Sequence, residues 1–568
     1  MNRRPSYLFL PLVGLLMMQS APAWSFGESN SNRPTPANPT SSSISTGLSE
    51  ALPISASGLE TLTIQEGGRK KPYLVFSEET LRSLSGKTTL TLEGSRRDSL
   101  SIVTGLWLDP AATLPSWREQ ELILVSNKPL KELLGLDPTR KLFSYNELTA
   151  SEVLAKKIAE AAESRRRDPK VRLVGIQKEA SDVAMRLGLL ESLLSGDAYR
   201  VVPPPSGHEW LSAEQGEPSL ILQKMRETWV EKDHKGFTET SGGLIHLQQF
   251  LGGSVGMPPA WKLSLEVLYQ KSHPFRWAWI FYALAGVVLL TFSGGWTRAG
   301  YRLAWICAGC GFALQAAGLL SRVLIAGRPP VTNMYESVIW VAFGTILFAL
   351  IFEAIYRAGS FLLGAVPVAV ASLIIADSQP VILDRSIHPL TPVLRDNFWL
   401  TTHVLSITLS YAALALALGV AHVALGRVIA RKKSSETIYN YLYKTLQVGV
   451  LLLAIGTILG GVWANYSWGR FWDWDPKETW ALTALLGYLF LLHGRISGLW
   501  GGFGLAVGSI IAFMSVLMAW YGVNFVLGAG LHSYGFGTGG FPLVAVFVGL
   551  ELLFLLVAFL RHRRTKAY

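Results

Sequence analysis

Five tryptophans fall within residues 463–480, and charged residues alternate with them. Tryptophan is enriched at membrane interfaces because its ring is apolar and its N–H group is polar, which would account for one or two of the five. A broad, flat ligand needs aromatic faces to stack on and a few polar groups that fix its rim. Haem fits that description, since it is an apolar macrocycle with two carboxylates, for which Arg470 or Lys477 is suited. The residues expected to contact the ring and its rim are Trp463, Trp468, Arg470, Trp472, Asp473, Trp474, Asp475 and Trp480.

Two histidines are predicted to lie beside this segment. His403 stands six residues into the apolar run that begins near Asn397, about 9 Å deep at 1.5 Å per residue of helix. His532 stands in the connection between the last two apolar runs. Two neutral imidazoles are suitable axial ligands for haem iron. Taken alone, His403 is equally consistent with a hydrogen bond between packed helices, and His532 with an ordinary loop residue.

Three further groups carry weaker signals. His493 lies about 14 residues into an apolar run, roughly 21 Å along a helix, and an ionisable group at such a depth in a membrane is a candidate functional residue. His422 is interpreted as a residue that reaches the membrane interface, with iron ligation as the alternative. Cys307 and Cys310 lie inside an apolar run and are expected to behave as small hydrophobic residues rather than as a redox pair. His388 is expected to be an ordinary loop residue.

These residues belong to a chain of two unlike halves. Residues 1–23 resemble a secretory signal peptide, with Arg3 and Arg4, a short apolar core and a small-residue cleavage site. Residues 24–58 are rich in Ser, Pro, Asn and Thr and predict a disordered tether. Residues 59–270 predict an exported α+β domain. Its expected strands are Tyr73–Phe76 and Leu122–Val125, and its expected helices lie at about 154–167, 183–194 and 216–233.

The second half, residues 277–561, predicts a multi-pass α-helical membrane domain, followed by a cytoplasmic tail at 562–568. Nine apolar runs are long enough to cross a bilayer: 277–294, 301–326, 334–356, 360–378, 397–425, 444–465, 479–498, 503–524 and 540–561. An exported first domain and alternation of the spans place the arginine-rich connections on the cytoplasmic side, as the positive-inside rule requires. The net charge of +11 therefore indicates membrane orientation rather than nucleic-acid binding. The tryptophan segment and His532 then face outward.

The membrane half also resembles a known family. The run from Trp468 to Trp480, with Gly461 to Ala464 before it, is similar to the tryptophan-rich "WWD" signature of CcsA, also called ResC, the haem-handling subunit of the system II cytochrome c synthetase. Gly327 to Ser337, and Val523-Asn524 with Gly530 to Gly535, resemble two other motifs of that family in the same order. The resemblance covers about residues 300–561. It implies that His403 and His532 are the two external haem ligands and that His493 ligates a second haem within the membrane.

The resemblance implies a function as well. The chain is expected to bind haem b and present it at the external, periplasmic face of a bacterial inner membrane for attachment to apocytochrome c, as a subunit of a holocytochrome c synthase. Expected partners are apocytochrome c, a ResB/CcsB-type membrane subunit, thiol-reducing proteins and membrane lipid. The alternatives are a haem lyase or haem-delivery protein of system I, a transporter with an exported binding domain, and an assembly scaffold that binds no haem. The sequence assigns no role to the amino-terminal domain, for which we expect docking of a partner or of apocytochrome c.

Overall fold

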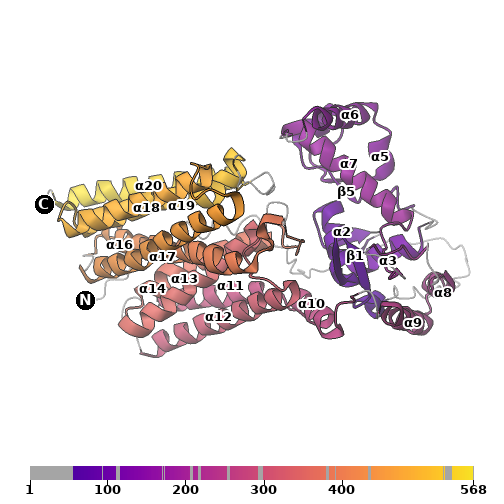
Figure 1. Cartoon of the computed structure of the whole chain (residues 1–568), viewed down its shortest axis with the longest axis horizontal. Coiled ribbons are helices and arrows are strands. Elements are labelled where there is room, and N and C mark those ends of the chain that lie inside the picture. Colours follow the sequence, from indigo (N-terminus) through magenta and orange to yellow (C-terminus); the bar gives the residue numbers. More distant parts are fainter. Residues whose placement is uncertain are drawn as a thin grey trace, which may run out of the picture.

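The computed structural model describes residues 55–566, apart from 93, 111–115, 169–170, 172, 205–208, 215–218, 253–255, 292–297, 379–382, 391, 433–435, 529, 531 and 533–539. The expected signal peptide and nearly all of the expected tether therefore lie outside the described residues. The described chain forms two parts placed end to end, a mixed amino-terminal part and a long bundle of helices (Figure 1). Each part has its own buried apolar core.

The amino-terminal part contains short antiparallel hairpins and helices, which confirms the α+β prediction. Its elements are η1 (Ala56–Leu59), β1 (Thr63–Glu66), β2 (Arg69–Pro72), α2 (Tyr73–Ser85), β3 (Thr89–Leu92), β4 (Ser95–Asp98), α3 (Ser99–Leu108), β5 (Ile123–Leu124), α4 (Lys128–Leu133), β6 (Leu142–Phe143), α5 (Tyr145–Thr149), α6 (Glu152–Arg167), α7 (Gly175–Leu194), α8 (Ser219–Val230), α9 (His234–Gly252) and α10 (Ala260–Ser272). Strands β1 and β2, β3 and β4, and β5 and β6 form three separate two-stranded sheets. Helices α6, α7 and α8 confirm the three helices expected from periodicity.

One predicted strand is wrong, because Tyr73–Phe76 is the first turn of helix α2. All four side chains are buried, and a short apolar run buried on every side has no period that separates a helix from a strand. Pro72, in an extended conformation directly before the helix, is the local signal that marks its start. The other predicted strand, Leu122–Val125, is confirmed by β5.

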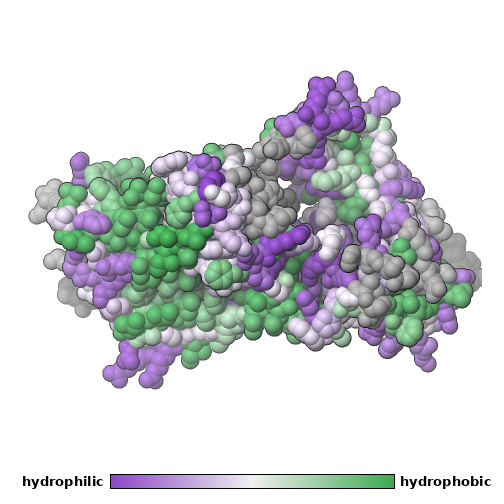
Figure 2. All heavy atoms as spheres, in the orientation of Figure 1, coloured by the Kyte–Doolittle hydropathy of each residue, from purple (hydrophilic) through white to green (hydrophobic). Residues whose placement is uncertain are grey.

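The bundle contains the nine predicted spans. With the start of the first span extended back to Ala260, the apolar helices are Ala260–Thr291, Arg298–Ala326, Met334–Tyr356, Ser360–Ser378, Asn397–Ile429, Glu436–Trp468, Pro476–Ile496, Gly502–Leu527 and Phe541–Arg564. They comprise α10 with α11 (Pro274–Thr291), α12 (Arg298–Ala326), α13 (Met334–Tyr356), α14 (Ser360–Ser378), α15 (Asn397–Trp399) with η3 (Leu400–Val404) and α16 (Leu405–Ile429), α17 (Glu436–Trp468), α18 (Pro476–Ile496), α19 (Gly502–Leu517) with η4 (Met518–Leu527), and α20 (Phe541–Lys566). Apolar side chains cover the visible face of this bundle, as Figure 2 shows. The chain is a multi-pass membrane protein.

Helix α16 lies at the centre of the bundle. In an 18-residue apolar stretch of its span, 78% of the residues are buried within the protein, whereas only 11% are buried in the corresponding stretch of α20. Small residues allow the central helices to approach closely, since a Cβ atom on Gly419 would meet the backbone of Gly364 in α14. Helix α16 is therefore the fixed element against which residues at the ends of its neighbours are positioned.

The two parts meet through the segment from Leu383 to His388. From the amino-terminal part, Glu78 Oε2 accepts a hydrogen bond from Arg385 at 2.8 Å, and Arg69 donates to the carbonyl of Ile387 at 3.4 Å. From the membrane part, Arg322 donates to the carbonyl of Arg385 at 3.0 Å. The segment is thus held from both sides, and it fixes the amino-terminal part at one end of the bundle.

Candidate functional site

A cavity opens at the end of the bundle that faces the amino-terminal part. Its empty volume is about 1050 Å³, a figure that includes space open to solvent. Its walls come from residues 331–337, from η3 and α16, from the end of α17, from the start of α18, from η4 and from His532. Both π-helical segments of the described chain, η3 and η4, line it. Such segments occur frequently at functional sites, because the wider turn displaces side chains from their helical positions.

His403 lines this cavity from the π-helical segment η3. Its Nδ1 lies 2.9 Å from the carbonyl oxygen of Gly456 in α17. A carbonyl only accepts, so Nδ1 carries the proton and Nε2 carries the lone pair. The ring lies 5.5 Å from that of Trp463. Gly460 makes this approach possible, since a Cβ atom there would stand 2.7 Å from Cε1 of the imidazole.

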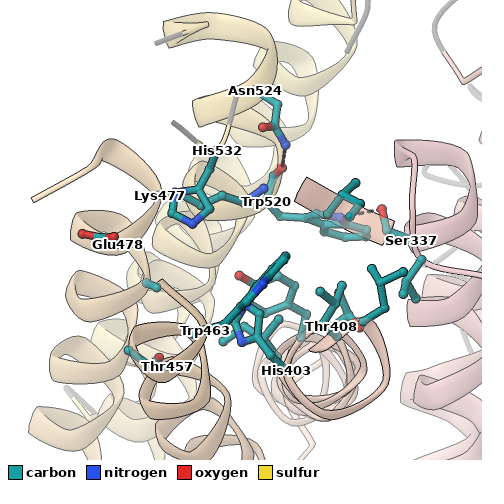
Figure 3. A pocket seen from close by; sticks show the side chains of 18 of the residues that line it. Ser337, His403, Thr408, Thr457, Trp463, Lys477, Glu478, Trp520, Asn524 and His532 are labelled. Carbon is teal, nitrogen blue, oxygen red and sulfur yellow. Dashed lines mark hydrogen bonds between the residues drawn. The ribbon is translucent and has the colours of Figure 1, made fainter. Parts of the chain in front are cut away.

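His532 lines the same cavity from the other side, as Figure 3 shows. Its Nδ1 donates to Oδ1 of Asp475 at 3.0 Å, and its ring meets the ring of Trp468 edge-on at a centroid distance of 5.0 Å. A histidine that ligates a metal commonly donates its other ring N–H to a carboxylate or a backbone carbonyl, which fixes the tautomer and the orientation of the ring. His403 and His532 each have one of these two partners.

The tryptophan segment forms the end of α17, a tight turn and the start of α18. Glu478 organises the turn, because its Oε2 accepts from the backbone N–H groups of Asp473 and Asp475 at 2.9 and 3.3 Å. Asp475 in turn caps α18 by accepting from the backbone N–H of Lys477 at 2.9 Å. Trp474 adopts a left-handed backbone conformation with φ of 58°. The carboxylates of Glu478 and Asp475 thus fix the backbone of the turn between α17 and α18 by accepting its N–H groups.

The two cations proposed for carboxylate binding differ in their surroundings. Arg470 donates to Glu478 at 3.1 Å and lies 3.4 Å from Asp473, and it is not among the residues that line the cavity. Lys477 lines the cavity, and its Nζ makes no hydrogen bond to any residue that the structure describes. The cation available to an acidic ligand in the cavity is therefore Lys477.

The predicted site residues separate into three groups. His403, His532, Trp463 and Trp472 line the cavity. Trp468 and Asp475 contact His532. The four remaining members of the segment, Arg470, Asp473, Trp474 and Trp480, lie outside the lining. Trp474 is 69% exposed and meets Trp472 edge-on.

His493 lies far from this cavity. It is sixteen residues beyond Lys477 on α18, roughly 24 Å along the helix. Its side chain is exposed, and Nδ1 donates to the carbonyl of Leu489 at 2.7 Å. His422 contacts the last helix, with Nε2 2.9 Å from Glu551 and its ring stacked on Phe554. Both nitrogens of His422 are engaged, since Nδ1 donates to the carbonyl of Leu418.

The remaining candidates also lie outside the cavity. Cys307 and Cys310 are free thiols on α12. His388 lies in the connection after α14, where it bonds to Asp384 at 2.7 Å. Among the described residues, no group of three or more His, Cys, Asp and Glu side chains could hold a bare metal ion.

Other residues of the cavity were not assigned as site residues from the sequence. Trp520 and Asn524 come from η4, and Thr332, Asn333 and Ser337 come from the start of α13 and the turn before it. Ser337 and Trp520 are joined, because Nε1 of the indole donates to Oγ at 2.9 Å. Asn524 and the 327–337 run lie in motifs that carry the family resemblance, and that was the available signal for them.

A second polar cluster lies directly behind this wall. Arg322 is 1% exposed and donates to Glu336 Oε1 at 2.7 Å and to Tyr269 Oη at 3.1 Å. Glu336 Oε2 accepts from the backbone N–H and the hydroxyl of Thr332 at 2.9 and 2.6 Å. The pair therefore fixes the turn that forms one side of the cavity and joins it to the segment 383–388.

Comparison with known proteins agrees with this geometry. The family of cytochrome c assembly proteins matches residues 331–532, a stretch that begins and ends at residues of the cavity wall. CcsA of Guillardia theta, a cytochrome c biogenesis protein, is 35% identical over 244 residues, which are 38% of this chain and 79% of that protein. CcsA of Synechococcus sp. strain CC9902 is 34% identical, over 39% of this chain and 83% of that protein. The chain belongs to the CcsA family of cytochrome c biogenesis proteins.

The similarity to CcsA proteins covers the membrane part, and another relative extends further. Protein NrfI of Wolinella succinogenes is 30% identical over 513 residues, which are 83% of this chain. The chain spans about half of the length of NrfI, 53%. Among solved structures, the cytochrome c haem lyase CcmF aligns over 51% of this chain with 15% identity and a TM-score of 0.37, which does not establish a shared fold.

Proposed function

We propose that this CcsA-family protein binds haem b in the cavity between His403 and His532 and presents it for covalent attachment to an apocytochrome c. The observation that carries the proposal is that two imidazoles, far apart in the sequence, line one cavity and each engage Nδ1 with a fixed acceptor. Imidazoles held in this way are suited to ligate iron through Nε2. Haem is the substrate in this proposal, and the protein supplies its position.

The other residues of the cavity fit the same ligand. Trp463 and Trp472 supply aromatic surface, and the apolar residues Leu400, Val404 and Ile407 supply the rest of a wall against which a macrocycle can pack. Lys477 Nζ offers a charge-assisted hydrogen bond to a propionate. We propose that Lys477, rather than Arg470, takes this role.

Attachment joins each vinyl group to a cysteine thiol of the acceptor. The sulfur bonds to one vinyl carbon and the thiol hydrogen passes to the other, so no atom is lost and the step needs no added oxidant or reductant. The contribution of this chain is proximity and orientation of the two reactants. We propose that the cavity and the amino-terminal domain face the periplasm of a bacterial inner membrane, as the positive-inside pattern favours.

His493 is proposed to contact a second haem, with a partner ligand from a ResB-type subunit. Its exposed position on the outside of the bundle supports a ligand that is shared with a neighbouring chain. Because it lies roughly 24 Å from Lys477 along α18, a His493→Ala variant should keep the haem of the cavity. Loss of that haem in the variant would contradict the assignment of two separate positions.

The test of the main proposal is the absorption spectrum of the purified full chain. We expect a Soret band of bis-histidine character in the wild type. His403→Gly and His532→Gly should each lose most of that haem, and imidazole added to the buffer should restore part of it because it can occupy the vacated volume.

His388→Ala is the matched control, since His388, like His532, lies outside the apolar helices but does not line the cavity. Its haem content should equal that of the wild type. Wild-type protein without haem, or an unchanged spectrum in the double His403→Gly/His532→Gly variant, would overturn the proposal and favour an assembly scaffold.

A further inference from the structure

Asn524 is the most deeply placed uncharged polar side chain in η4, and it lines the cavity (Figure 3). It is 8% exposed. Its Nδ2 donates to the carbonyl oxygen of Trp520 at 3.1 Å. Trp520 is itself anchored, because its indole N–H donates to Ser337 across the cavity wall. The amide of Asn524 is therefore bonded to a residue that is itself held in place.

The other amide atom, Oδ1, is buried and has no hydrogen-bond partner among the described residues. Exchanging Oδ1 and Nδ2 would place an oxygen against the carbonyl of Trp520 and lose the existing bond, so the orientation of the amide is determined by its surroundings. A buried acceptor without a donor destabilises the protein. Such an atom in a ligand cavity indicates that the donor comes from a ligand.

Haem does not offer that donor. Its four ring nitrogens hold the iron, and its carboxylates at neutral pH only accept hydrogen bonds. The carboxylates are also the groups that Lys477, in the same cavity, is suited to bind. Apart from water, the donor then belongs to a second occupant, and under the proposed function that occupant is a polypeptide that carries backbone N–H and cysteine S–H groups.

We propose that Asn524 Oδ1 is a positioning contact for the acceptor polypeptide and accepts a hydrogen bond from a backbone N–H or a thiol beside the attachment site. This inference rests on the proposed function. It places the polypeptide at the side of the cavity formed by η4 and His532, the two features that Figure 3 shows together. One fixed acceptor at this point would hold the thiol near the ring and thereby increase the effective concentration of the reactants.

The experiment uses the full chain loaded with haem and a synthetic peptide that contains Cys-x-x-Cys-His. Haem content is measured first, and the affinity for the peptide is then measured from the change in the Soret band. Asn524→Leu, which keeps the approximate shape and removes the acceptor, should retain haem and bind the peptide about fivefold to tenfold more weakly, the effect of one neutral hydrogen bond.

Two further variants separate a lost contact from a damaged fold. Asn524→Gln keeps an amide that can both donate and accept, and it should bind the peptide more tightly than Asn524→Leu does. Ser509→Ala removes another buried oxygen without a partner, in α19 and outside the cavity lining, and should change neither haem content nor peptide affinity.

Three outcomes would overturn the inference. Haem-loaded Asn524→Leu with wild-type peptide affinity would show that water alone satisfies Oδ1. Parallel loss of haem and peptide binding in both Asn524 variants would show that the residue acts on the haem. A peptide affinity of Asn524→Gln equal to that of Asn524→Leu would count against an accepted hydrogen bond. Failure of the proposed function is recognised separately, because the wild type would then carry no haem.

Discussion

Two buried polar regions lie on opposite sides of one short wall, and they differ in how completely their groups are paired. Behind the wall, the guanidinium of Arg322 and the carboxylate of Glu336 bond to one another and to Tyr269, Thr332 and the segment 383–388. In the cavity, Asn524 Oδ1 is buried and makes no hydrogen bond to a described residue. The half-buried Lys477 also lines the cavity, and its Nζ makes no hydrogen bond to a described residue. Buried polar groups that are fully paired specify a structure, whereas an unpaired polar group that lines a cavity can be satisfied by a ligand. The difference indicates which region serves stability and which serves binding.

The largest expected effect comes from breaking the paired region. Arg322→Met leaves Glu336 as a buried charge without its cation, and removal of one partner of such a pair costs about 3–5 kcal/mol of unfolding free energy. Adding Glu336→Gln should restore most of that loss, because the glutamine oxygen is neutral and still accepts from Thr332. Unfolding midpoints in detergent would measure both effects. If Arg322→Met were as stable as the wild type, the paired region would not be the one that stabilises the fold.

The unpaired region should behave in the opposite way. Lys477→Met breaks no hydrogen bond of the described chain, so the unfolding midpoint should stay close to that of the wild type. The affinity for haem should fall about tenfold to a hundredfold, as expected for a charge-assisted hydrogen bond, and haem titration would measure it. Lys444→Met, near the other end of α17 where Nζ donates to Tyr356, is the control with unchanged haem affinity. If Lys477→Met lost stability but kept its haem affinity, Lys477 would stabilise the fold rather than bind the ligand.

A smaller effect should follow from crowding His403. Gly460→Ala places a methyl group where a Cβ atom would stand 2.7 Å from the imidazole, and an extra methyl in a packed interior costs about 1–3 kcal/mol. Because the imidazole must move, the Soret maximum or the haem content should also change. Gly487→Ala is the matched control on α18, since nothing lies within 4 Å of its added Cβ atom. Equal spectra for both variants would show that haem binding does not depend on the present position of the His403 imidazole.

The smallest effect concerns the segment between the two parts. The hydrogen bond to Asp384 raises the pKa of His388 above its usual value. Partial desolvation of the Asp384 carboxylate raises its pKa, but the bond from His388 outweighs this effect and holds the pKa of Asp384 below its ordinary range. The contribution of His388 is fully present below about pH 6.5 and is lost as the pH rises through its raised pKa. That of Asp384 is present above about pH 3.9 and is lost as the pH falls through its depressed pKa.

Asp384→Asn should therefore lower the pKa of His388 toward its ordinary value, with little change in stability because both side chains are largely exposed. Hydrogen exchange at the imidazole, followed by mass spectrometry, would measure the pKa. A pKa of His388 that is unchanged in the variant would show that the carboxylate is not its main partner.

The sequence predicted the membrane half well because its signals are long. Nine apolar runs and the interleaved arginines determine the spans, and the structure differs from the predicted ranges mainly by joining α10 to the first one. The amino-terminal half was predicted less well, since the sheets in its described residues are two-stranded and their strands have at most four residues. Such short elements carry little periodicity, which is how Tyr73–Phe76 was assigned to the wrong class.

For the candidate site, residue types pointed to His403, His532 and the tryptophans, but they could not show which polar groups are already engaged. Arg470 and Lys477 are equivalent in the sequence, and only the turn built around Glu478 separates them. The wide turns of η3 and η4 were not predicted from the sequence. The position of Asn524, with one amide atom bonded and the other left over, is a consequence of tertiary packing.

Asp475 joins two tasks in one side chain, since it caps α18 and also accepts from His532. A substitution at this position should therefore produce a composite phenotype, in which a frayed helix and a misplaced imidazole arrive together. Genetic screens would score Asp475 as indispensable without revealing which task failed. Gly530 shares this sensitivity, because a methyl group there would collide with the same carboxylate.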